Sequence, residues 1–134
     1  KIIFRPHPAN RKTEITLKIK NAFKNNKNFS FDESNDYFYT YLNSSCLVSD
    51  VSGTAYTYAF LTKKPVIFFS SHEQLIEDLE YSDLSFFIDR EKIGKVVKNL
   101  EELTNSIENI KGIEKKKFVF RKHWMIKRVS IDHK

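Results

Sequence analysis

The chain has 134 residues, of which 40% are hydrophobic and 30% are charged, and its net charge is +6 at pH 7. This length suits a single domain with its own core, and the composition is that of a globular protein, which excludes an intrinsically disordered chain. The positive charge favours an anionic partner, such as nucleic acid, an acidic lipid surface or a phosphate-bearing substrate.

The cysteine content and the hydropathy of the chain narrow its cellular setting. Cys46 is the single cysteine, so the chain cannot form an intramolecular disulfide, and no cysteine and histidine cluster has zinc-site spacing. No apolar run reaches the ~18 residues of a membrane helix, and no leader opens the sequence. We therefore expect a cytoplasmic protein. Because the chain opens without methionine on a strand-like segment, we also expect it to be a piece of a longer protein.

Strands alternate with helices along the predicted chain. Apolar residues at helical spacing follow a first strand that ends at Pro6 and Pro8, because proline removes an amide donor. In the first third we expect a strand at 1–5, a helix at 13–24 that Thr13 can cap, a strand at 29–31 and a helix at 37–42. Further on we expect a strand at 46–48, a helix at 54–62, a strand at 65–69, a helix at 72–80, an edge strand at 86–88, a helix at 93–110 and a basic helix at about 115–130.

This alternation predicts the α/β class, as a Rossmann-like open parallel sheet with helices on both faces. The continuous apolar run at 65–69 is typical of a parallel strand buried on both faces. We assign the apolar strands and the apolar stripes of the helices to the core.

Two polar segments follow predicted strands directly, where the ligand crevice of an open parallel sheet lies. In the first, Arg5 suits bidentate recognition of phosphate, or else forms a surface salt bridge. His7 offers acid, base or phosphate-donor roles near neutral pH, or else is a loop histidine bonded to a backbone carbonyl. Both interpretations of each residue stay open.

The second segment, residues 49–54, consists mainly of small residues and directly precedes a predicted helix. The first amides and the dipole of such a helix attract phosphate. Gly53 allows close approach of the backbone, and the hydroxyls of Ser52 and Thr54 can cap the helix or donate to a phosphate oxygen. Asp50 can fix the loop or accept from a ribose hydroxyl. The alternative is that these residues only stabilise their own turn.

The tail at 115–128 carries seven basic residues among aromatic and aliphatic ones. Such a segment suits an anionic membrane surface, a solvated terminal helix or docking onto another domain. The basic residues do not coincide with a recognisable nucleic-acid motif, so we expect no nucleic-acid partner.

Three segments together resemble the CDP-glycerol glycerophosphotransferase family, whose members polymerise teichoic-acid backbones. They are Phe4-Arg5-Pro6-His7-Pro8, Leu47-Val48-Ser49-Asp50-Val51-Ser52-Gly53-Thr54 and Lys64-Pro65-Val66-Ile67-Phe68-Phe69. The resemblance spans about residues 1–70 and is to the C-terminal domain of that family. It implies one half of a GT-B fold, with residues 1–134 as a single donor-nucleotide-binding domain and an N-terminal domain that supplies the acceptor side.

The resemblance also implies a transferase of teichoic-acid or capsule synthesis in the cell envelope. A polymer or lipid-linked hydroxyl would attack the distal phosphorus of CDP-glycerol or a similar CDP-linked donor, with His7 as the catalytic residue. Arg5, Asp50, Ser52, Gly53 and Thr54 would bind the donor, and neither a metal nor another cofactor is demanded. Such an enzyme would work in the cytoplasm, peripherally at the inner face of the cell membrane.

Two other functions stay open. The same phosphate-binding turn can hold a nucleotide sugar in a GT-B glycosyltransferase, and the turn here reads Val51, Ser52 and Gly53 where the family commonly has an aromatic residue and two serines. The chain can also be a non-catalytic module that binds an anionic ligand or a membrane. Since half of the implied active site lies elsewhere, we expect the isolated chain to bind a nucleotide weakly and to turn over nothing.

Overall fold

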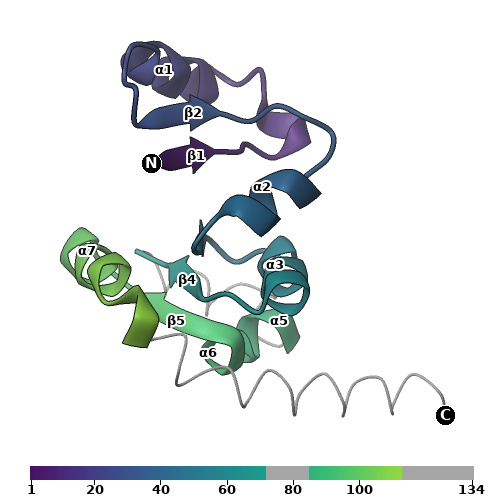
Figure 1. Cartoon of the computed structure of the whole chain (residues 1–134), viewed down its shortest axis with the longest axis vertical. Coiled ribbons are helices and arrows are strands. Elements are labelled where there is room, and N and C mark those ends of the chain that lie inside the picture. Colours follow the sequence, from purple (N-terminus) through teal and green to yellow (C-terminus); the bar gives the residue numbers. More distant parts are fainter. Residues whose placement is uncertain (72–84, 113–134) are drawn as a thin grey trace, which may run out of the picture. The chain divides into compact units, whose positions relative to one another are not determined.

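The computed structural model describes residues 1–71 and 85–112, and the chain divides into two compact units, Lys1–Asn43 and Ser44–Lys134. Each unit contains parallel strands joined by helices (Figure 1). The predicted α/β class with parallel strands in open, Rossmann-like sheets is therefore confirmed. In the described part of the chain no helix combines the length and the apolar character needed to cross a membrane.

The first unit is a strand-helix-strand arrangement followed by a short helix. Its elements are β1 (Ile2–Phe4), the 3₁₀ helix η1 (Pro8–Asn10), α1 (Glu14–Phe23), β2 (Phe29–Phe31) and α2 (Phe38–Asn43). β1 pairs parallel with β2, with Ile2 opposite Phe29 and Phe4 opposite Phe31. All four predicted strands and helices of this region are confirmed, with ends shifted by at most one residue.

Aromatic rings hold the first unit together. The ring of Phe23 at the end of α1 stacks on Phe29, with centroids 4.8 Å apart, and Phe4 meets Phe31 edge-on at 5.1 Å. Since Phe4, Phe29 and Phe31 share a sheet face by strand alternation, α1 packs on this face through its last turn.

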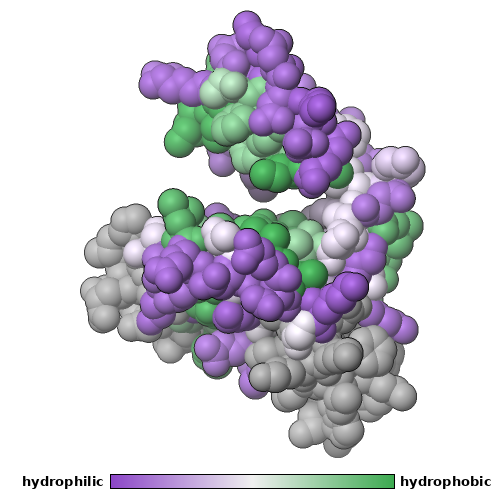
Figure 2. Space-filling model, turned by 60° about the vertical axis from the view of Figure 1, so that its left-hand side comes forward, coloured by the Kyte–Doolittle hydropathy of each residue, from purple (hydrophilic) through white to green (hydrophobic). Residues whose placement is uncertain are grey.

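The interpretation of the whole apolar stripe of α1 as core is wrong. Ile15 and Leu17 are 69% and 48% exposed, whereas Thr16 is buried. The side of α1 that meets the sheet carries Thr16 and Phe23, whose ring stacks on Phe29, and this places Ile15 and Leu17 about 100° to either side of Thr16. Apolar residues accordingly reach the surface beside hydrophilic ones (Figure 2).

The second unit contains a sheet of three parallel strands in the order β3-β4-β5. Its elements are β3 (Leu47–Ser49), α3 (Thr54–Thr62), β4 (Val66–Phe69), α5 (Ser85–Ile88), α6 (Arg90–Ile93), β5 (Gly94–Val97) and α7 (Leu100–Glu108). The central strand β4 is fully buried at Val66, Ile67 and Phe68, as the apolar run predicted. The predicted helix at 54–62 is also confirmed.

Two predictions in the second unit are wrong. Residues 86–88 form part of helix α5, and the predicted helix at 93–110 is divided into β5 and α7. The apolar residues Val96 and Val97 fit both the helical and the strand periodicity. They form a strand because they pair with the buried β4. The predicted helices at 72–80 and about 115–130 lie outside the described residues.

A capping box marks the true start of α7. The side chain of Asn99 accepts a hydrogen bond from the Glu102 amide at 2.9 Å, and Glu102 accepts from the Lys98 amide at 2.8 Å. The first bond satisfies an amide of the first turn of α7, and the second reaches the residue before the N-cap, one position earlier than in a standard capping box. The Asn99-x-x-Glu102 pattern was readable in the sequence and places the helix start after β5.

Gly94→Ala tests how closely β5 approaches β4. A Cβ atom at Gly94 would lie 2.5 Å from the carbonyl oxygen of Val66, which belongs to the buried central strand. We expect a loss of roughly 1–3 kcal/mol in the free energy of unfolding, measured by chemical denaturation. Gly112→Ala is the matched control, because a Cβ there meets nothing within 4 Å. Equal stability of the two variants would contradict the close approach.

Candidate functional site

The first polar segment leaves the carboxyl end of β1 and turns at once into η1. His7 is exposed and lies at the N-cap of η1, where its Nδ1 accepts a hydrogen bond from the Ala9 amide at 3.2 Å. The His7 carbonyl accepts from the Asn10 amide at 2.8 Å. Because Nδ1 acts as an acceptor, the neutral ring carries its proton on Nε2. The ring therefore presents an N–H donor from a fixed turn, and it bonds a backbone amide rather than a backbone carbonyl.

Arg5 is held by a carboxylate and a carbonyl. Its Nη1 lies 2.6 Å from Oδ2 of Asp32, and its Nη2 donates to the Ser34 carbonyl at 2.9 Å. The side chains of Arg5 and Asp32 are only 19% and 13% exposed. The salt bridge considered for Arg5 thus exists, and it joins the ends of β1 and β2.

Asp32 is the centre of this network. It also accepts hydrogen bonds from the hydroxyl of Thr40 and, at 2.9 Å, from the Ser34 amide. Burial by itself raises the pKa of Asp32, but the hydrogen bonds from Thr40, Ser34 and Arg5 outweigh burial and hold this pKa far below its usual range. The sequence analysis missed Asp32, although it follows a predicted strand and the strand-end rule that selected Arg5 selects it too.

The second polar segment, residues 49–54, joins β3 to α3. The Ser52 hydroxyl accepts from the Thr54 amide at 3.4 Å, and the amides of Ala55 and Tyr56 donate to carbonyls three residues back, each at 3.1 Å. The first turn of α3 therefore closes on itself, and the Ser52 bond is long. This bond agrees with the alternative in which Ser52 stabilises its own turn, and its phosphate role stays a prediction.

Open space surrounds Gly53. A Cβ atom there would meet nothing within 4 Å, and its φ of −60° is accessible to any residue. Asp50 and Thr54 on either side are exposed. Neither backbone conformation nor packing requires a glycine at this position, so the space beside it is available to a ligand.

The predicted site residues thus fall into two groups. Arg5 and His7 belong to the first unit, where Arg5 bonds Asp32 and Ser34 and His7 bonds the Ala9 amide. The residues of the second segment belong to the second unit and form one turn. Each group follows the carboxyl end of a parallel strand, which is where the sequence analysis placed it.

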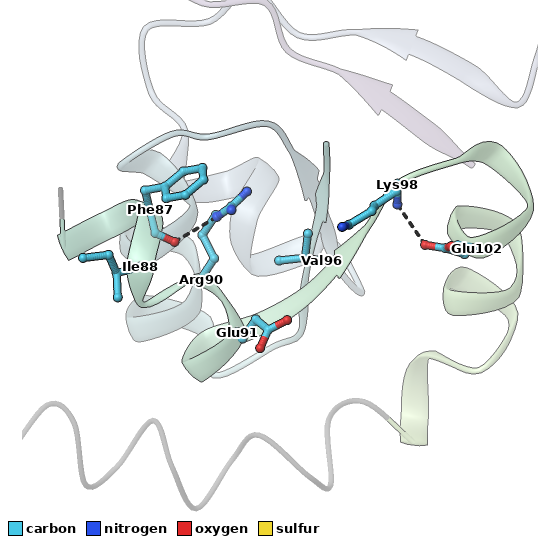
Figure 3. Close-up of a pocket in the computed structure, with 7 residues that line it drawn as sticks. All are labelled: Phe87, Ile88, Arg90, Glu91, Val96, Lys98 and Glu102. Carbon is cyan, nitrogen blue, oxygen red and sulfur yellow. Dashed lines mark hydrogen bonds between the residues drawn. The ribbon is translucent and has the colours of Figure 1, made fainter. Parts of the chain in front are cut away.

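A pocket of about 450 Å³ lies elsewhere in the second unit (Figure 3). Arg90 lies against Phe87, with its guanidinium carbon 3.8 Å from the ring centroid and its Nε bonded to the Phe87 carbonyl. The lining residues are Phe87, Ile88, Arg90, Glu91, Val96, Lys98 and Glu102. None of the predicted site residues is among them, and the lining carries two cations and two carboxylates, a mixture that does not favour a polyanionic ligand.

Comparison with known proteins identifies the chain. The family model of CDP-Glycerol:Poly(glycerophosphate) glycerophosphotransferase matches residues 1–128. The chain belongs to this family. Membership confirms the resemblance read from the sequence and supports a transferase of the glycerophosphotransferase type. No curated protein and no solved structure matches the chain.

Over 1–71 and 85–112 no group of three or more histidine, cysteine, aspartate or glutamate side chains is arranged to hold a metal ion. The polar side chains of the two segments are hydroxyls, a histidine, an arginine and a carboxylate, which suit hydrogen bonding to phosphate and ribose.

Asp32→Asn tests the network at the first segment. We expect a loss of about 1.5–3 kcal/mol in the free energy of unfolding at pH 7, because the charged acceptor of three donors is lost. The pKa of Asp32 is lowered in the folded state, so its stabilisation is complete above pH ~4 and is lost as the pH falls further. The difference between the wild type and the variant should therefore shrink below pH ~4.

Glu33→Gln is the control for this experiment. Glu33 is the neighbouring carboxylate and pairs with Lys20 at 2.9 Å, but both side chains are nearly half exposed. We expect its loss to stay below about 1 kcal/mol. A difference between the wild type and Asp32→Asn that grew below pH 4 would contradict the lowered pKa.

Proposed function

We propose that this chain is the donor-binding part of a transferase that moves glycerol phosphate, or a related group, from a CDP-linked donor to a hydroxyl of a polymer or lipid-linked acceptor. Membership in the glycerophosphotransferase family supports the type of reaction. The observation that carries the proposal is the exposed imidazole of His7, oriented by the Ala9 amide at the carboxyl end of β1.

The reaction is a phosphoryl substitution. A bond forms between the acceptor oxygen and the distal phosphorus of the donor, and the bond from that phosphorus to the bridging oxygen breaks, so that CMP leaves. The proton of the acceptor hydroxyl passes to a base, and negative charge grows on the leaving phosphate. The Nε2–H of His7 donates a hydrogen bond to this charge, which is electrostatic stabilisation rather than covalent catalysis.

The turn at 49–54 binds the diphosphate of the donor. The Ser52 bond to the Thr54 amide is longer than an ordinary hydrogen bond, so a phosphate oxygen can replace it at little cost. The N-terminal end of α3 carries a partial positive charge, and the space beside Gly53 lets a phosphate approach the backbone. Asp50 is exposed and accepts from a ribose hydroxyl. A phosphate contact by Arg5 stays a prediction, since a phosphate would compete with Asp32 for the guanidinium.

The wider setting belongs to the same proposal. Residues 1–134 form a single donor-binding domain of a GT-B enzyme, and an N-terminal domain supplies the acceptor side. The enzyme acts in teichoic-acid or capsule synthesis in the cytoplasm, at the inner face of the membrane. The net charge of +6 supports contact with an anionic polymer or an anionic lipid surface.

Calorimetric titration of the chain with CDP-glycerol, CMP, UDP-sugars and UMP tests the donor. We expect weak binding with cytidine selectivity, and a loss of about tenfold in affinity for CDP-glycerol in His7→Ala and in Ser52→Ala, which corresponds to one hydrogen bond to a charged group. Ser45→Ala is the control, since Ser45 is exposed in the same unit before β3. Selectivity for uridine would point to a glycosyltransferase, and the absence of nucleotide binding would contradict the proposal.

A further inference from the structure

Two arginines of the first unit meet at one carbonyl oxygen. The Nη2 of Arg5 donates to the Ser34 carbonyl at 2.9 Å, and the Nη2 of Arg11 donates to the same oxygen at 3.0 Å. Arg11 also donates from Nη1 to Oδ1 of Asn35 at 3.3 Å. Two positive charges are therefore held within a few ångströms of each other at the loop that follows β2.

Only one of these charges has a carboxylate partner. Arg5 pairs with Asp32 at 2.6 Å, whereas the acceptors of Arg11, the Ser34 carbonyl and Oδ1 of Asn35, are neutral. Over residues 1–71 and 85–112, Arg11 has no ion pair. Two cations that share an oxygen repel each other, and an anion placed beside Arg11 relieves that repulsion.

The guanidinium of Arg11 also has an unmet hydrogen bond. Its Nε is buried and has no acceptor within the described part of the chain. A buried donor without a partner costs about 1–3 kcal/mol. Because Nε is closed to solvent, a phosphate meets this donor only when the Arg11 side chain turns outward, and one edge of the planar guanidinium then matches two phosphate oxygens.

Arg11 and His7 are carried by the same short turn. Between them lies η1, closed by the bond from the Asn10 amide to the His7 carbonyl, and the Arg11 amide donates to the Pro8 carbonyl. The turn follows the carboxyl end of β1, where open parallel sheets bind their ligands. An anion that reaches His7 therefore enters the field of Arg11.

We propose that Arg11, which the sequence analysis did not select, is the arginine that binds the diphosphate of the donor, and that Arg5 is committed to the structural pair with Asp32. This assignment rests on the proposed function, because it names a further contact for the same donor. The charge of Arg5 is neutralised by Asp32, whereas the charge of Arg11 is not.

Titrations with CDP and with inorganic pyrophosphate test this assignment in the full chain. We expect Arg11→Ala to weaken the binding of both ligands about tenfold or more, while Lys12→Ala, which removes an exposed neighbouring charge, changes binding less than about twofold. Arg11→Gln is the second variant, because it keeps a donor for the Ser34 carbonyl without the charge. It should bind as weakly as Arg11→Ala, with a thermal unfolding midpoint close to that of the wild type.

The outcomes separate this inference from the proposed function. If the wild type binds CDP and both Arg11 variants bind it equally well, Arg11 is only a structural clamp and the inference is overturned. Equal losses in Lys12→Ala and Arg11→Ala would overturn it too, since they would show an unspecific charge effect. If pyrophosphate binds through Arg11 but CDP does not bind, the anion site is supported and the proposal of a cytidine-linked donor is rejected. Binding of neither ligand by the wild type overturns both.

Discussion

Parallel pairing of the strands is the constraint on which both units depend. Two parallel neighbours need a crossover between them, and α1 and α3 supply it for β1-β2 and β3-β4. The same geometry brings the carboxyl ends of paired strands to one edge of their sheet. Polar residues that follow these strands are thereby collected without any sequence proximity, as Arg5 and Asp32 are across 27 residues.

Once the strand ends are together, charge decides what each residue can do. Asp32 gathers Arg5, Thr40 and the Ser34 amide, and this network fixes the loop that follows β2. A guanidinium that is bound this way contributes to folding and has little left for a ligand. In the first segment, the groups available for a ligand are therefore those that this network positions without neutralising their charge.

The sequence predicted the fold where a pattern had one physical interpretation. The run at 65–69 is too short for a helix and too apolar for a surface, and it forms the buried strand β4. The prediction failed at 93–110, because Val96 and Val97 fit both periods and the choice is made by β4, a distant partner. It failed for Ile15 and Leu17 because a stripe of apolar residues does not say which side of α1 meets the sheet.

The candidate site, like the fold, could be predicted from the sequence only in part. Local motifs selected His7 and the turn at 49–54 as candidates, because a strand end, a proline and a glycine are visible in a few neighbouring residues. The roles of Arg5, Arg11 and Asp32 depend on partners 23 to 29 residues away, and no local pattern predicts which arginine a carboxylate will neutralise. These side-chain pairs could be assigned only from the structure.

Gly53 carries a consequence for how this protein can vary. Its backbone conformation is open to any residue, and a Cβ atom would meet no other atom within 4 Å, so folding does not require a glycine at this position. Gly53 is the N-cap of α3, a position where serine, asparagine or aspartate stabilises a helix at least as well as glycine. A glycine that persists at this turn across a set of related sequences would therefore report selection by a bound molecule rather than by the fold, which makes the position a marker for retained binding in chains too divergent to compare elsewhere.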